Sequence, residues 1–243
     1  MAHFILKVFL FIFLIFGTTV FAAIDDEVTL NRAYIKGSMG IGYFFDNNNA
    51  TAQNRDATFP NAKYDIAYEG ATSYSFAVGN RLENLAYETS FDYIFANLDS
   101  VTSDTLSNYT DGDISTHSII INALWYPDLL RWNYMEMYVG AGIGTVYKVD
   151  LDQSGCIGAR CLANEGFKSA VDEYQVAYQF LLGVESEIFK ADSKVFPAGF
   201  SIFSEVRDIF FDNIALGRDN HNETFNNIDI NVMLWTFGVK FHF

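Results

Sequence analysis

In several segments of the sequence, apolar and polar side chains alternate, and charged residues stand at some of the polar positions. Opposite charges that share an enclosed space are expected to pair, because an unpaired buried charge is energetically expensive. The sequence therefore favours a network of ion pairs, and the alternative is a narrow ion path or gate lined by the same side chains. The alternation assigns these cations and acids to one shared face: Lys36, Arg81, Lys148, Arg207, Lys240, Glu88, Asp92, Glu136, Glu185 and Glu205.

The histidines offer candidate bases for hydrolytic chemistry. Beyond residue 22 the chain contains His117, His221 and His242. His117 adjoins Ser118, and neighbouring residues of a strand point to opposite faces, so these two side chains cannot pair directly. His221 lies in an Asn-rich stretch and His242 is next to the last residue. These spacings assemble no Ser-His-acid triad, and we expect no enzymatic activity.

The chain has two cysteines, in the stretch Gly155-Cys-Ile-Gly-Ala-Arg-Cys161. Nearby cysteines in an oxidising compartment usually pair, so we expect a disulfide between Cys156 and Cys161. Two thiolates are too few for a structural zinc site. The run from Asp150 to Gly155 imitates the start of a calcium loop, but Cys161 stands where an EF-hand needs a glutamate. We expect no metal and no cofactor.

Alternating segments must position these side chains. In the last residues of the chain, Trp235, Phe237, Val239, Phe241 and Phe243 alternate with more polar residues such as Lys240. A strand with one apolar and one polar face separates two different solvents. Such strands are typical of a membrane barrel, with lipid outside and polar side chains inside, and the predicted fold is an all-β, eight-stranded antiparallel up-and-down transmembrane β-barrel. The seven other alternating segments are 34–45, 72–82, 85–95, 115–126, 134–148, 173–185 and 199–210.

Long polar connections alternate with short turns between the predicted strands. The long connections span about 46–70, 97–114, 149–172 and 212–226, and they are rich in Asn, Asp, Ser and Thr. Outer-membrane barrels have short periplasmic turns and long extracellular loops. We therefore expect these four segments to be extracellular loops.

The N-terminus predicts a signal peptide of residues 1–22. Lys7 precedes an apolar run from Val8 to Phe16, and Val20-Phe21-Ala22 provides a cleavage pattern. The run is shorter than the roughly 20 apolar residues of a transmembrane helix. The mature domain is then 23–243. A formal net charge of −15 argues against binding to nucleic acid, which depends on neutralising phosphates.

The whole mature chain resembles the small eight-stranded bacterial outer-membrane barrels: the OmpA membrane domain, OmpX, and the opacity-protein and surface-antigen group. The resemblance rests on the signal peptide, on Phe203-Ser-Glu-Val-Arg207 with its inward Glu and Arg, and on the terminus from Phe237 to Phe243. It implies a monomer that is inserted into the outer membrane by the barrel-assembly machinery and that contacts outer-membrane lipid and lipopolysaccharide. The assembly signal would be Trp235, Phe237, Val239, Phe241 and Phe243.

The first functional hypothesis is a non-enzymatic surface protein whose loops mediate adhesion or another interaction with a host or environmental ligand. Long loops, a disulfide in one of them and a charge-paired interior favour it. The alternative is a small channel or carrier for ions or small solutes across the outer membrane. A fold alone does not decide between them.

Overall fold

The structure is a computed structural model that describes residues 31–45, 47–54, 60–103, 111–132, 135–157, 160–169, 175–189, 199–217 and 223–243. The predicted signal peptide of residues 1–22 lies outside the described residues. Among the described residues, no helix is long and apolar enough to cross a membrane.

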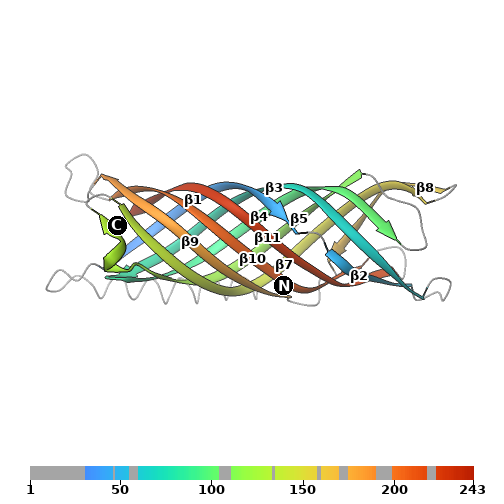
Figure 1. The fold of residues 1–243 in the computed structure, drawn as a ribbon, viewed down its shortest axis with the longest axis horizontal. Coiled ribbons are helices and arrows are strands. Elements are labelled where there is room, and N and C mark those ends of the chain that lie inside the picture. Colours follow the sequence, from blue (N-terminus) through green and yellow to red (C-terminus); the bar gives the residue numbers. More distant parts are fainter. Residues whose placement is uncertain are drawn as a thin grey trace, which may run out of the picture.

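The described strands form a closed antiparallel barrel of eight strands (Figure 1). Each barrel strand pairs with its neighbour in chain order, and β1 closes the sheet against β11. The predicted fold class is confirmed. The barrel strands are β1 (Asn31–Phe44), β3 (Pro60–Leu82), β4 (Leu85–Ser103), β5 (Asp111–Trp125), β7 (Met135–Ile157), β9 (Gln175–Phe189), β10 (Phe200–Gly217) and β11 (Glu223–His242).

The barrel has two different ends. The turn end carries the C-terminus, the tight β3–β4 turn at Glu83, the 3₁₀ helix η1 (Asp128–Leu130) and the short strand β6 (Arg131–Trp132). The opposite end, here called the extension end, carries β2 (Asn47–Asn54) and β8 (Arg160–Ser169). Strand β2 pairs with β3 and β11, and β8 pairs with β7 and β10.

These two strands correct the sequence prediction, which treated 46–70 and 149–172 as loops. The barrel strands also run into all four of the predicted loop segments. The reason is that pairing with an adjacent strand, more than local propensity, decides whether a polar segment is β-structured. The extracellular location of these segments stays a prediction.

The register of the strands determines how much room the barrel contains. A line of cross-strand partners that starts at Tyr43 returns to β1 at Ala33, ten residues away along the same strand. An eight-stranded barrel of this kind is just wide enough for side chains to fill its interior. The partners on that line are Tyr43, Met233, Asp208, Phe180, Ala141, Ala123, Tyr87, Asn80 and Ala33.

Alternation along the strands separates the two faces of the sheet. In β9, buried and exposed residues alternate strictly from Gln175 to Leu182. In β11, Trp235, Phe237 and Phe241 are exposed on the outside, whereas Lys240 and His242 are buried inside. The predicted phases of these strands are confirmed, and the outer wall is apolar as a lipid-facing surface requires.

Candidate functional site

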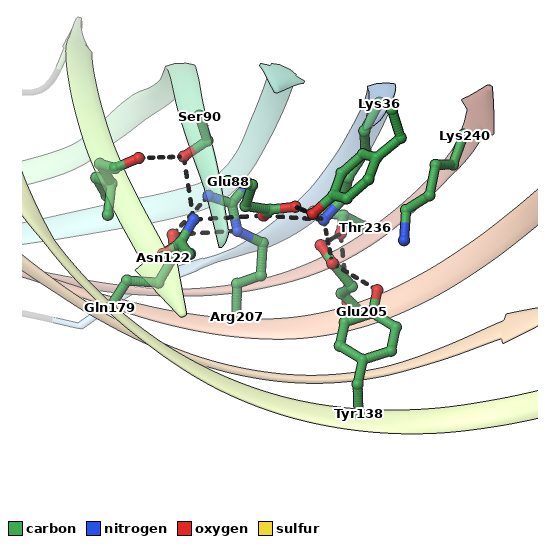
Figure 2. A network of polar contacts seen from close by, with 12 residues as sticks. Lys36, Glu88, Ser90, Asn122, Tyr138, Gln179, Glu205, Arg207, Thr236 and Lys240 are labelled. Carbon is green, nitrogen blue, oxygen red and sulfur yellow. Dashed lines mark hydrogen bonds and ion pairs between the residues drawn. The ribbon is translucent and has the colours of Figure 1, made fainter. Parts of the chain in front are cut away.

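Lys36 of β1 lies at the centre of the polar network inside the barrel (Figure 2). Its Nζ is 3.2 Å from Glu88 Oε1 and also pairs with Glu205 Oε1, so one ammonium bridges two carboxylates from different strands. The Tyr34 hydroxyl donates to Glu88 Oε2 at 3.0 Å, and the Tyr138 hydroxyl donates to Glu205 Oε1 at 2.6 Å. Both buried glutamates therefore have a cation and a hydroxyl donor.

Two glycines make room for these tyrosines. A Cβ added to Gly79 would lie 2.4 Å from Tyr34 Cζ, and one added to Gly183 would lie 2.3 Å from Tyr138 Cζ. No heavy atom fits at that separation from an aromatic ring. The rings occupy the space that side chains at these two positions would otherwise take.

Arg207 of β10 forms the second part of the network. Its Nη1 is 2.8 Å from Asp92 Oδ1, and its Nη2 and Nε donate to Gln179 Oε1 at 2.5 and 3.2 Å. The Gln179 amide in turn donates to Asn122 Oδ1 at 3.0 Å, and the Asn122 amide donates to Glu88 at 3.4 Å. Amide side chains thus connect the Arg207 pair to the Lys36 pair.

Lys240 and Glu185 form a further ion pair nearer the turn end. The Lys240 ammonium also donates to the Tyr126 hydroxyl at 3.0 Å, and its Nζ lies 4.5 Å from the centre of the Tyr34 ring. Closer still to the turn end, Glu136 accepts from Arg81 at 2.5 Å and from Arg131 at 2.8 Å. Ion pairs therefore succeed one another from the middle of the barrel to its turn end.

A serine, a histidine and a glutamate meet at this end, which the sequence spacing did not predict. His242 Nε2 lies 2.9 Å from Ser201 Oγ and 3.1 Å from Glu185 Oε1. A Ser-His-acid triad needs the serine and the acid on different ring nitrogens, and here both contact Nε2. All three side chains are buried. The contact ties the end of β11 to β9 and β10.

Lys148 is the predicted interior residue that the structure places elsewhere. Its side chain is 51% exposed on the outer wall and pairs with Asp150. The cause is an irregularity in the β5–β7 ladder: His117 pairs with Lys148, but Ser118 pairs with Val146, so β7 contains one extra residue there. Because side chains alternate along a strand, one extra residue exchanges the two faces beyond it.

The remaining predicted charges lie inside, and the deeper ones are closed to solvent. Because these charges are paired and buried, the described part of the interior contains no continuous row of solvent-accessible charges. Ion pairs and amide side chains are buried there together with a cluster of Tyr34, Ala86, Leu124, Tyr126, Tyr138 and Leu181. The following residues are each at most 5% exposed: Lys36, Glu88, Asp92, Glu185, Glu205, Arg207 and Lys240.

The interior toward the extension end is apolar, which the sequence interpretation missed. Ile120 of β5 shares the inward phase of Ser118 and Asn122, so the alternation already contained the signal. We call this cluster the apolar half and the ion-pair network the polar half. The apolar half consists of Phe44, Ala71, Ile94, Ala96, Ile114, Ile120, Val146, Val149, Ala177, Ile209, Phe211, Ile230, Val232 and Leu234, with Tyr68 packed against it.

A groove on the outer wall adjoins the apolar half. It has a volume of about 630 Å³, and two of its lining residues, Ala71 and Leu234, belong to the apolar half. It lies where the β1–β3 ladder ends, at the pair Tyr43 and Gly70. The groove is lined by Ile41, Gly42, Tyr43, Gly70, Ala71, Thr72, Val206, Met233, Leu234 and Trp235.

The two cysteines lie opposite each other in the β7–β8 hairpin, where Cys156 and Cys161 are cross-strand partners. This backbone placement is compatible with the predicted bridge, which stays a prediction.

The fold is similar to solved structures of bacterial outer-membrane proteins. The outer membrane protein OprG from Pseudomonas aeruginosa is 12% identical, with 88% of this chain and 96% of that chain covered and a TM-score of 0.54. Neisserial surface protein A is 14% identical, with 86% and 95% covered and a TM-score of 0.46. The outer membrane protein AlkL is 16% identical, with 90% and 94% covered and a TM-score of 0.45. No protein-family model matches the sequence, and no curated protein matches it.

Proposed function

We propose that this eight-stranded barrel is a non-enzymatic protein of the bacterial outer membrane that binds partners at the cell surface through its extension end. The observation that carries the proposal is the length of the strands. Strands β3 and β7 have 23 residues each, whereas about 9–11 residues cross the hydrocarbon core. The sheet therefore continues well beyond the lipid-facing band, and β2 and β8 widen it there.

A β-structured extension suits binding because its strands are held by ladder hydrogen bonds before a partner arrives. A preformed surface loses less conformational entropy on binding than a loop that must first become ordered. A Cys156–Cys161 bridge would add to this order in the β7–β8 hairpin. Export by the signal peptide and insertion by the barrel-assembly machinery complete the proposal.

The composition of segment 97–114, into which β4 and β5 run, indicates the chemistry of the partner. The segment 97–114 contains Asp99, Asp104, Asp111 and Asp113 and no Lys or Arg. Acidic surfaces attract basic partners and accelerate their association. A surface ligand with clustered Lys or Arg residues, or another polycation, fits this end.

Adhesion of intact cells to a polylysine-coated surface tests this function. Cells that carry Asp→Asn substitutions at the four acids of segment 97–114 should adhere less than wild type at low ionic strength, and salt should reduce the difference. The control neutralises two exposed acids, Glu83 of the β3–β4 turn and Asp128 of η1. Equal adhesion of wild type, variant and control would contradict the proposal.

The closed polar half favours this function over ion conduction. Wild-type protein in a planar bilayer should give no steady single-channel conductance, because the charges of the polar half are paired and buried. A steady conductance that disappears on Glu88→Gln or Glu205→Gln would favour a channel over a surface-binding protein.

A second candidate function is the binding or carriage of apolar small molecules, which the outer-wall groove favours. A Cβ at Gly70 would meet only Gly42 O, at 3.7 Å, so Gly70→Leu can fill the groove without a backbone clash. Gly37 lies outside the groove lining and has no atom within 4 Å of an added Cβ, so Gly37→Leu is the matched control. Reduced uptake of an apolar dye in Gly70→Leu alone would support carriage.

A further inference from the structure

The bulge in β7 changes which side chains face the membrane. Up to Val146 the inward residues of β7 are the even-numbered ones, such as Tyr138, and beyond the bulge Val149 is the buried residue. Tyr147 is the extra residue in the ladder, because His117 pairs with Lys148 and Ser118 with Val146. In a regular ladder without this bulge, alternation from Val146 would point Lys148 inward, toward the apolar half. Bulges are commonly used to redirect a side chain in this way.

The redirected lysine joins a group of amphipathic side chains on the outer wall. The His117 ring lies between Tyr93 and Tyr147, with ring centres 4.8 and 5.8 Å away. Lys148 is the cross-strand partner of His117, and its ammonium is held by Asp150. The bulge therefore brings one ammonium, one imidazole and two phenols together on one patch of the lipid-facing wall.

The position along the strands corresponds to the edge of the hydrocarbon core. Lys148 is the fourteenth residue of β7 counted from Met135 at the turn end, and about 9–11 residues cross the core. Tyrosines with an apolar ring and a polar tip are typical of the level of the lipid headgroups. The cross-strand pair Ile121 and Ile143, exposed on the same wall nearer the turn end, gives an acyl chain an apolar surface below the charged group.

Lys148 is also unusual among the cations. Of the residues whose side chains the structure describes, Lys36, Arg207 and Lys240 are buried inside, and Arg32, Arg81 and Arg131 belong to the turn end. Within that described set, Lys148 is the cation that the outer wall presents toward the extension end. Asp150 pairs with this ammonium, whose side chain is still 51% exposed, and an anionic headgroup is the further anion that a membrane supplies at this level.

We propose that Lys148, His117 and Tyr147 bind a phosphate group on the headgroup of an outer-leaflet lipid, whose acyl chains lie along the wall at Ile121 and Ile143. This inference rests on the outer-membrane location proposed above. Lys148 donates to the phosphate oxygens, His117 and Tyr147 contribute further donors, and Asp150 holds the ammonium in place while weakening its attraction for the anion.

Native mass spectrometry of the folded protein with lipid A, and with lipid A stripped of its phosphates, tests the site. Lys148→Gln should reduce bound lipid A about fivefold, the effect of one cation near an anionic membrane surface. Lys148→Arg should retain binding, and Arg131→Gln at the turn end is the matched control with no loss. Wild type should bind the phosphate-free lipid no better than Lys148→Gln binds lipid A.

Substitution of Asp150 distinguishes a lipid-binding site from an ion pair that only stabilises the bulge. If the Lys148–Asp150 pair only stabilises the bulge, Asp150→Asn and Lys148→Gln should weaken lipid binding alike. The proposal instead expects Asp150→Asn to strengthen it, because the ammonium loses a competing anion. Equal binding by wild type and Lys148→Gln, or full displacement of lipid A by millimolar inorganic phosphate, overturns the proposal. Failure of the protein to insert into vesicles would instead contradict the membrane location itself.

Discussion

The polar half and the apolar half of the barrel fill the same kind of space by different means. In the polar half each acid contacts a cation, and Lys36 is shared by Glu88 and Glu205, so side chains from different strands are interlocked. In the apolar half, burial of hydrocarbon stabilises residues that have no single required partner. We therefore expect single substitutions in the polar half to be strongly destabilising. In the apolar half we expect the loss of stability to increase with the side-chain volume removed.

Loss of the central cation should have the largest effect. Lys36→Met keeps the length of the side chain but leaves Glu88 and Glu205 without their shared ammonium. Removing one partner of a buried ion pair costs about 4 kcal/mol. Urea titration of the protein folded into lipid vesicles measures this change. A loss below about 1 kcal/mol would mean that water enters the polar half and hydrates the two acids.

A cavity in the apolar half should have a somewhat smaller effect. Leu234 is buried, and Leu234→Ala should reduce the free energy of unfolding by about 3 kcal/mol through lost burial and an unfilled space. Leu129→Ala, at an exposed position of η1, is the control and should change stability by less than about 0.5 kcal/mol. A loss at Leu234 as small as that of the control would show that the apolar half is loosely packed.

Conservative substitutions on one strand compare the two halves directly. Arg207 and Ile209 both point inward from β10. Arg207→Lys removes the fork that contacts Asp92 and Gln179 and should cost about 2 kcal/mol. Ile209→Val should cost about 1 kcal/mol. Both losses of stability would be measured in the same vesicle unfolding assay. A larger loss for Ile209→Val than for Arg207→Lys would contradict the expected difference between the two halves.

The partly exposed ion pair between Arg32 and Glu187 should have the smallest effect. Its side chains are 34% and 29% exposed, and the atoms lie 3.2 Å apart. Arg32→Gln should lower stability by at most about 1 kcal/mol, and added salt should remove the difference. A loss as large as that of Lys36→Met would mean that exposure does not distinguish the pairs.

Alternation made the barrel and most of its interior charges predictable from the sequence. Slipping a strand by one residue would place residues such as Glu88 or Lys240 in lipid, so each phase is strongly specified. The prediction was wrong at Lys148, because the extra residue in β7 is visible only in how β5 and β7 pair. The contact among Ser201, His242 and Glu185 was also missed, because three strands must be assembled before these residues meet.

The apolar half was missed for a different reason. Residues such as Ile94 and Ile120 share the inward phase of polar neighbours and are buried. They were not predicted to form an interior cluster because the whole interior was expected to be polar. Strands β2 and β8 could not be found from alternation, because their segments are mainly polar and are held by neighbouring strands.

The seam between β1 and β11 has a kinetic consequence. Tyr34 pairs with His242, so the ladder that closes the cylinder joins residues from nearly opposite ends of the chain. Contacts between such distant residues form slowly, because a long loop must close before they are gained. Until then the chain has two open strand edges, which invite pairing with other chains. A nascent chain of this protein must therefore be kept from aggregating until β11 is available, since closure of the barrel depends on pairing between β1 and that distant strand.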